Sequence, residues 1–348
     1  MLILEIASPA SVAILVRSRT PTMSSSSNMP RFSSPATRSS RGSPCLVSVC
    51  PSGLVPGFTT DKIGPPVVLG QRFTGLLPWD INKKLTGIQD NLHQFALNMV
   101  KERRARFAKD KTAAESMNDI LSLLVRSNDF DDHQLSEQVL TMMAAGHETT
   151  SSALSWCAYL LSLHPETQRK VREEVRAALP SPDSGEAIDS AQIDALPLLN
   201  AVCLEVVRLY PTVPQTTRIA VNETHINGHV IPKETQISLV PWAINRSKHF
   251  WGADANEFRP ERFINADGTN NKTGGSSSNY AQLTFLHGPR SCIGQGFAQS
   301  ELKCLLAAFV GRYEFKLARE GGDYFPAGLV TTKPVGGMWL KMKSVDGW

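Results

Sequence analysis

Acidic residues are absent from the front of this sequence, and that shortage separates it from the rest of the chain. Between positions 6 and 60 there is no aspartate or glutamate, whereas serine, proline and arginine are frequent. A stretch of this composition cannot bury enough apolar surface to fold by itself. We therefore expect residues 1–60 to be a disordered, low-complexity leader; a transit peptide is a second interpretation of the same composition.

Four further shortages exclude other classes of protein. The six cysteines include no Cys-x-x-Cys pair and no disulfide framework, which indicates a reduced compartment. A net charge of +4 is too small to argue for nucleic acid as a partner. The apolar run at residues 2–16 is interrupted by Glu5 and Pro9, so it is too short and too polar for a membrane-spanning helix. No glycine-rich dinucleotide-binding motif is present, so a redox reaction would draw its electrons from another protein.

One cysteine, Cys292, lies in a glycine-containing loop that precedes a predicted helix. Residues 285–294 read Phe-Leu-His-Gly-Pro-Arg-Ser-Cys-Ile-Gly and precede a helix predicted over residues 294–312. Gly288 and Gly294 allow backbone conformations that side chains disfavour, so that N–H groups can turn toward the sulfur of Cys292. The N-terminus of the helix adds partial positive charge. These effects favour a thiolate over a thiol, although a buried cysteine in a turn is the simpler interpretation of this segment alone.

The segment resembles the haem-binding loop of the cytochrome P450 family, Phe-x-x-Gly-x-Arg-x-Cys-x-Gly, and every fixed position is filled. The resemblance implies that Cys292 is the axial thiolate ligand of haem b iron, whose electron donation favours O–O cleavage. It also implies that Phe285, His287 and Gly288 belong to the cofactor site. Arg290 would meet a haem propionate.

A second match lies in residues 145–150, Ala-Gly-His-Glu-Thr-Thr. Apolar residues cover most of a helical wheel over residues 135–163, which predicts a buried helix ~40 Å long. The segment resembles the acid–alcohol pair of the P450 distal helix, in which Thr149 would hydrogen-bond dioxygen and Glu148 would relay protons. A kinked helix with a satisfied buried carboxylate remains open. A zinc-protease motif is excluded because its second histidine would fall at Ser151.

A third match joins two separated segments. Glu205 and Arg208 stand three residues apart in a helix predicted between Pro197 and Pro211, so they share a helix face. Alone, such a pair is usually a solvated ion pair. The resemblance implies that Arg262, within Phe-Arg-Pro-Glu-Arg-Phe, closes a buried Glu–Arg–Arg cluster beneath the ligand loop. Its role would be structural, and loss of one member would cost ~3–5 kcal/mol.

Weaker matches concern the cofactor's edge and the substrate. Arg218 resembles an arginine that meets a haem propionate, although an ordinary surface arginine is the alternative for it and for Arg290. Residues 329–334 and 336–339 are expected to form two strands around a glycine turn, the family's final hairpin. Residues 266–279 are expected to be a flexible insert. By family analogy the substrate pocket would be lined by Ala144, Ala145, Val213, Thr216 and Val330.

The resemblance covers residues 61–348 and implies a mainly α fold with a small β portion. The family's front portion, including a helix with Trp-x-x-x-Arg, has no counterpart in the sequence, so the fold is expected to be N-terminally incomplete. The implied activity is insertion of one oxygen atom from O2 into a lipophilic small molecule, a secondary metabolite or a fatty-acid-like compound. Electrons would come from NADPH through NADPH–cytochrome P450 reductase, a flavoprotein. Family analogy places the protein on the cytosolic face of the endoplasmic reticulum membrane; without an anchor it would be cytoplasmic.

Alternatives remain at this point. The chain would be an inactive remnant if the absent helices are needed to retain haem. It would be a reductase-independent isomerase if it rearranges oxygenated substrates, but the Glu148–Thr149 pair argues against that chemistry. Basic residues would meet an acidic redox partner, although a solvated face explains them equally well; they are Arg169, Lys170, Arg172 and Lys303.

Overall fold

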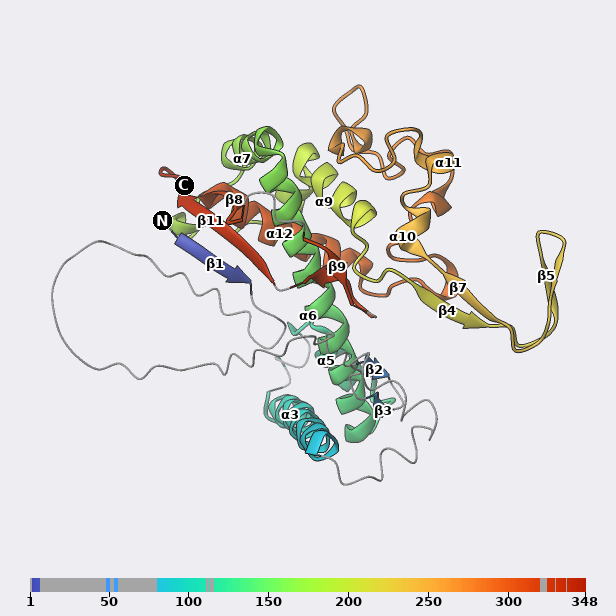
Figure 1. Ribbon diagram of the computed structural model, residues 1–348. Coiled ribbons are helices and arrows are strands. Elements are labelled where there is room, and N and C mark those ends of the chain that lie inside the picture. The colour runs from blue at the N-terminus through green and yellow to red at the C-terminus, as the bar shows by residue number, and fades with distance from the viewer. Residues whose placement is uncertain are drawn as a thin grey trace. The chain divides into compact units, whose positions relative to one another are not determined.

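The computed structural model describes residues 2–6, 48–50, 53–55 and 80–348, the last range with gaps at 111, 113–115, 320–323, 329 and 336. Two compact units are present, Ser25–His147 and a second made of Met1–Ser24 with Glu148–Trp348. Helices predominate and the sheets are small, which confirms the predicted fold class (Figure 1). The predicted leader lies mostly outside the described residues and stays a prediction.

The unit Ser25–His147 is built on helices α3 (Asp80–Lys109), α5 (Ile120–Ser127) and the first half of α6 (Asp132–Leu163). Helix α5 begins because the Asp119 side chain accepts the N–H of Ser122, and it ends at Asn128, whose φ is 55°. Strands β2 (Ser48–Cys50) and β3 (Gly53–Val55) pair antiparallel. The buried core is formed by Ala96, Val100, Leu121, Val125, Leu135 and Val139.

The other unit packs the second half of α6 with α7 (Pro165–Ala178), α9 (Pro197–Leu209) and α12 (Gln295–Arg312). The predicted helices at 135–163, between Pro197 and Pro211, and at 294–312 are thus confirmed. Trp156, Leu199 and Leu306 are among the core's fully buried side chains. The shorter helices are α8 (Ser190–Asp194), α10 (Pro241–Ile244), α11 (Lys248–Trp251), η2 (Pro182–Ser184), η3 (Pro260–Phe263), η4 (Asn279–Ala281) and η5 (Gly288–Arg290).

The sheets of this unit are antiparallel. β11 (Met338–Ser344) lies between β1 (Leu2–Ile6) and β8 (Tyr313–Leu317). The two-stranded sheets pair β4 (Thr216–Ile219) with β7 (Gln236–Leu239), β5 (Thr224–Ile226) with β6 (His229–Ile231), and β9 (Pro326–Ala327) with β10 (Lys333–Pro334).

The predicted final hairpin is wrong in its pairing. β10 pairs with β9, and β11 pairs with β8 and β1, so the described residues on either side of position 336 do not pair with each other. Alternate residues of β11, Met338, Leu340 and Met342, are buried in the helical core. This alternation places β11 beside β8, which leaves α12 directly and already lies on that core.

Buried polar side chains join the elements. The Gln168 amide donates to the carbonyls of Leu161 and Phe315 at 3.1 and 2.9 Å, which ties α7 to α6 and β8. Glu174 of α7 accepts the N–H groups of Leu198 and Leu199 at 2.8 Å and so caps α9. No helix among the described residues is both long enough and apolar enough to cross a bilayer.

Candidate functional site

The cysteine loop is closed by its own backbone. The N–H of Cys292 donates to the carbonyl of Phe285 at 2.9 Å, and that of Ser291 to the carbonyl of Gly288 at 3.0 Å. Gly288 has a φ of 76°, as its predicted role requires. Gly294 differs from expectation, because its φ of −89° is open to any residue. A Cβ there would lie 4.0 Å from Cys292 Sγ, in ordinary van der Waals contact, so the structure shows no steric need for glycine at this position.

The surface around the sulfur is apolar and open. Cys292 is an exposed free thiol at the start of α12. Ile293, which follows Cys292 in the sequence, and Phe297, in the first turn of α12, are 89% and 69% exposed. Large apolar side chains exposed together mark a binding surface. A flat apolar ligand held by the sulfur would cover both, so these residues fit a haem.

A cavity of about 690 Å³ adjoins the loop, a volume in the usual range for small-molecule sites. Its walls include Thr149 and Thr150 of α6, Val207 of α9, and Ala298 and Leu302 of α12, and the ligand loop contributes Phe285, Leu286 and His287. Thr150 Oγ1 is buried and has no hydrogen-bond partner among the described residues. A buried hydroxyl without a partner is suited to bond a molecule in the cavity.

The residues predicted to contact substrate do not line this cavity. Ala144 and Ala145 are exposed on α6, and Val330 is 40% exposed. Val213 and Thr216 are half-buried. Their assignment to a substrate pocket stays a prediction.

Glu148 is paired rather than isolated. Its Oε1 lies 3.1 Å from Nζ of Lys333, and the two side chains are 30% and 41% exposed. The expected buried carboxylate is therefore half-buried, and α6 continues through it as an unbroken helix. Ser151 Oγ donates to the Glu148 carbonyl at 3.1 Å, a back-bond of the kind that loosens helices locally. Glu148 thus has one cationic partner and contact with water.

The Glu–Arg–Arg cluster is compact and saturated. Glu205 and Arg208 are 0% exposed, and Arg262 is 7% exposed. Arg208 meets Glu205 in a bidentate pair at 2.6 and 2.8 Å. Arg262 Nε donates to Glu205 Oε1 at 3.0 Å.

Every guanidinium N–H of Arg208 finds an acceptor. Besides Glu205, these are the carbonyls of Asn245 and Ala255 at 2.7 Å and of Glu257 at 3.2 Å. The guanidinium also lies 4.7 Å from the centre of the Trp251 ring. A buried charge satisfied in this way holds α9 and the segment leading into η3 in one arrangement.

Asn245, which sequence reasoning missed, joins this cluster to the ligand loop. Its side chain donates to the carbonyl of Arg208 at 3.1 Å and to Thr284 Oγ1 at 2.9 Å, and it accepts the N–H of Leu283 at 2.7 Å. Thr284 in turn donates to the Val207 carbonyl at 2.7 Å. Residues 283 and 284 lead directly into Phe285. No local motif marks this asparagine, because its partners are far away in sequence.

The two arginines predicted to meet haem propionates differ in exposure and in hydrogen bonding. Arg290 is exposed on η5, and Arg218 donates to Thr216 Oγ1 and the Thr217 carbonyl at 3.0 and 2.9 Å. Of the basic residues considered for a redox partner, Arg169 pairs with Glu166 and Glu173. The remaining three also have partners inside the chain: Lys170 with Glu166, Arg172 with the Val310 and Tyr313 carbonyls, and Lys303 with Asp194.

These features define a helical protein with an open cysteine loop beside a small-molecule cavity. The cytochrome P450 family model matches residues 65–339, and the chain belongs to that family. The chain is 46% identical over 275 residues to the cytochrome P450 monooxygenase sphH of Aspergillus fumigatus, covering 78% of this chain and 50% of the relative.

Two other relatives match a similar fraction of this chain and about half of their own length. Identity is 38% over 276 residues to the cytochrome P450 monooxygenase ptmK of Penicillium ochrochloron, covering 77% of this chain and 52% of the relative. It is 32% over 282 residues to the cytokinin hydroxylase of Arabidopsis thaliana, covering 80% and 52%. The chain thus spans about half the length of the curated relatives it matches.

Proposed function

We propose that residues 61–348 form a haem-thiolate monooxygenase unit that inserts one oxygen atom from O2 into a lipophilic small molecule. The observation that carries the proposal is the exposed Cys292, held in a closed loop whose first three residues, 285–287, line a cavity together with α6 and α9. A secondary metabolite or a fatty-acid-like compound is the substrate class that the family resemblance implies.

Cofactor binding falls to the loop and to two arginines. Cys292 would hold the iron of haem b, and the exposed Ile293 and Phe297 would contact the porphyrin. Arg290 is exposed and Arg218 half-buried, so both guanidinium groups can still receive a propionate. Phe285 and His287 line the adjoining cavity. When bound, a haem with a thiolate ligand supplies the activation of dioxygen.

Proton delivery falls to α6. Thr149 lines the cavity and would donate a hydrogen bond to dioxygen there. Glu148 precedes it in the helix and is partly exposed, so it can take protons from water and pass them toward Thr149. Lys333 would hold the carboxylate in position between transfers.

The Glu205–Arg208–Arg262 cluster would have no part in the chemistry. Its contribution would be to fix the backbone entering the ligand loop through Asn245. Electrons would come from NADPH through a flavoprotein reductase at the endoplasmic reticulum membrane, as the family resemblance implies.

The test is spectroscopic. The full chain is expressed with haem supply, reduced and treated with carbon monoxide. The wild-type protein is expected to give a thiolate-type Soret band, which Cys292→Ser should lose. Cys304→Ser is the matched control, because Cys304 is also an exposed thiol on α12 but is not in the loop. An unchanged spectrum in Cys292→Ser would show that this sulfur is not the ligand.

Turnover separates the alternatives. With reductase, NADPH and a panel of lipophilic substrates, the haem-loaded chain should form monooxygenated products. Failure to retain haem, seen as no thiolate-type Soret band in the reduced, carbon monoxide-treated sample, would favour the inactive remnant. Turnover of peroxide substrates alone would favour the isomerase.

A further inference from the structure

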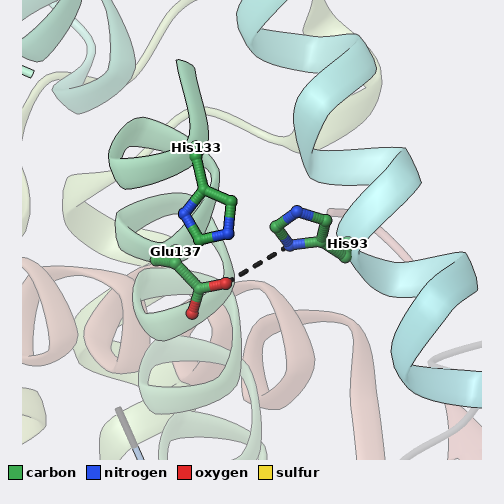
Figure 2. Close-up of side chains that lie close together, drawn as sticks. All are labelled: His93, His133 and Glu137. Atoms are coloured by element: carbon green, nitrogen blue, oxygen red, sulfur yellow. Dashed lines mark ion pairs between the residues drawn. The ribbon is translucent and has the colours of Figure 1, made fainter. Parts of the chain in front are cut away.

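Two histidines and a glutamate converge in the unit Ser25–His147, in a place that the oxygenase chemistry does not use. His93 comes from α3, and His133 and Glu137 come from the first turns of α6. One potential ligand atom from each lies within 4.8 Å of the others. Among the described residues no other group of three histidine, cysteine or carboxylate side chains meets this criterion. Figure 2 shows the two rings and the carboxylate turned toward a common point.

One of the ligand separations matches that of a tetrahedral metal site. His93 Nδ1 lies 3.3 Å from Glu137 Oε1, and the two imidazole centres are 5.0 Å apart at an interplanar angle of 54°. In a tetrahedral zinc site with metal–ligand bonds of about 2.0–2.1 Å, neighbouring ligand atoms are about 3.3–3.4 Å apart. The observed pair matches this separation. Tilted rings allow both nitrogens to aim at one ion.

The packing of α3 against the start of α6 holds the backbone at the three ligands in place before any ion binds. His93, Ala96 and Val100 share one face of α3, and the latter two pack in a core with Leu135 and Val139 of α6. Arg104 of α3 donates to Asp132 Oδ1 at 2.6 Å and to the Phe130 carbonyl at 3.0 Å. His133 and Glu137 are four residues apart and therefore face the same way. A preorganised set of donors binds a metal with less loss of entropy.

The donor chemistry selects the ion. Two imidazoles and one carboxylate suit zinc and similar divalent transition metals, whereas calcium and magnesium prefer oxygen ligands throughout. His93 and Glu137 are 30% and 43% exposed, and His133 is exposed, so an ion can enter from solvent. A fourth position would be filled by water.

We propose that His93, His133 and Glu137 form a zinc site that clamps α3 to the start of α6. A hydrogen bond between His93 and Glu137 alone would use one imidazole and leave His133 without a role. The site is separate from the haem chemistry proposed above.

The test uses the full, tag-free chain after removal of metals with a chelator. Calorimetric titration with zinc chloride should give one site per chain, and equal concentrations of magnesium or calcium should give none. His133→Ala and Glu137→Gln should each weaken zinc binding by about tenfold or more. Both side chains are at least partly exposed and Glu137→Gln keeps an acceptor for His93, so both variants should fold.

The matched control is His229→Ala, because His229 is an exposed histidine on β6 outside the cluster. It should bind zinc as the wild type does. Zinc should also raise the melting temperature of wild type and His229→Ala by several degrees, and of His133→Ala much less. Wild-type zinc affinity in both cluster variants, or no stoichiometric binding by the wild type, would overturn the proposal.

Discussion

Gly288 carries a backbone conformation that the ligand loop cannot do without. Its φ of 76° lies in the left-handed region, and a Cβ built there would meet nothing within 4 Å. Gly288→Ala should therefore cost ~1–2 kcal/mol through backbone strain alone. We expect a lower free energy of unfolding in urea and weaker haem retention.

Gly296→Ala is the control for that prediction. Gly296 also has open space around it, but it lies inside α12. Alanine there should be neutral or stabilise by ~0.5–1 kcal/mol. Equal losses in the two variants would show that the conformation at position 288 is not what matters.

Residue spacing in the sequence could predict the ligand loop, but it could not predict the contacts of Asn245 and Lys333. The residues of the loop around Cys292 are contiguous in sequence, so its motif could be recognised directly. Arg262 lies far from Glu205 and Arg208 in sequence, and its place in their cluster was predicted only from the resemblance to the family. Asn245 and Lys333 were missed. Their partners lie 38 and 185 residues away, at Leu283 and Glu148, and no local pattern encodes such a pairing.

At the scale of elements, the α9–η3 junction depends on the buried charges. Arg262→Met should remove one of the two guanidinium partners of the buried Glu205 carboxylate, which keeps its bidentate pair with Arg208, and should cost ~1.5–3 kcal/mol. Arg259→Met is the matched control, because the Arg259 side chain is 55% exposed and pairs only with Asp254 among the described residues. It should cost under ~1 kcal/mol. Urea unfolding of both variants measures the difference, and similar losses would show that burial does not set the cost.

The cap of α5 gives a pH-dependent prediction. Burial alone would raise the pKa of Asp119, but hydrogen bonds from Ser122 and Arg103 outweigh it and lower that pKa from 3.8 to about 2. A depressed carboxyl pKa stabilises the fold above the ordinary pKa, and this contribution disappears as pH falls through the depressed value. Asp119→Ala should cost ~1 kcal/mol at neutral pH through loss of the cap.

Asp119→Asn separates the two contributions. Asparagine still caps the helix, so only the ion pair with Arg103 is lost, and the 45% exposure of the carboxylate keeps that loss small. In urea unfolding, the cost of Asp119→Ala should stay constant from neutral pH to about 5 and shrink below 3.8. A cost that grew on acidification would contradict the assigned pKa direction.

Helices were easier to predict than strands, for a physical reason. The helices α6, α9 and α12 follow from local periodicity and from Pro197 and Pro211. Strand pairing depends on partners distant in sequence, so the expected final hairpin was wrong. The expected flexible insert at 266–279 is anchored instead: Asn270 donates to the Pro197 carbonyl at 2.8 Å and Asn271 to the Arg262 carbonyl at 3.1 Å.

At the scale of the whole molecule, the number of basic residues is a poor guide to where a redox partner would bind. Arg169, Lys170, Arg172 and Lys303 all have partners within the chain. Carboxylates partly compensate the charges of Arg169, Lys170 and Lys303, and the Arg172 guanidinium is bound to backbone carbonyls. The family, by contrast, was predictable because its motifs occur in the right order along the chain.

The two compact units have separate buried cores, and this division predicts how the chain unfolds. Leu135 is 0% exposed in the α3–α5–α6 core, and Leu306 is 0% exposed in the core of α7, α9 and α12. Truncation of either leucine to alanine should cost ~2–5 kcal/mol. Units with their own cores need not unfold in one step.

Calorimetry of the full chain should therefore resolve two transitions. Leu135→Ala should lower the midpoint of one and Leu306→Ala that of the other, and zinc should shift only the transition that Leu135→Ala affects, because the proposed ligands lie in that unit. Two variants that moved one common transition by similar amounts would show a single cooperative unit. In that case the buried cores at Leu135 and Leu306 would stabilise each other, and the effect of zinc would extend to the ligand loop.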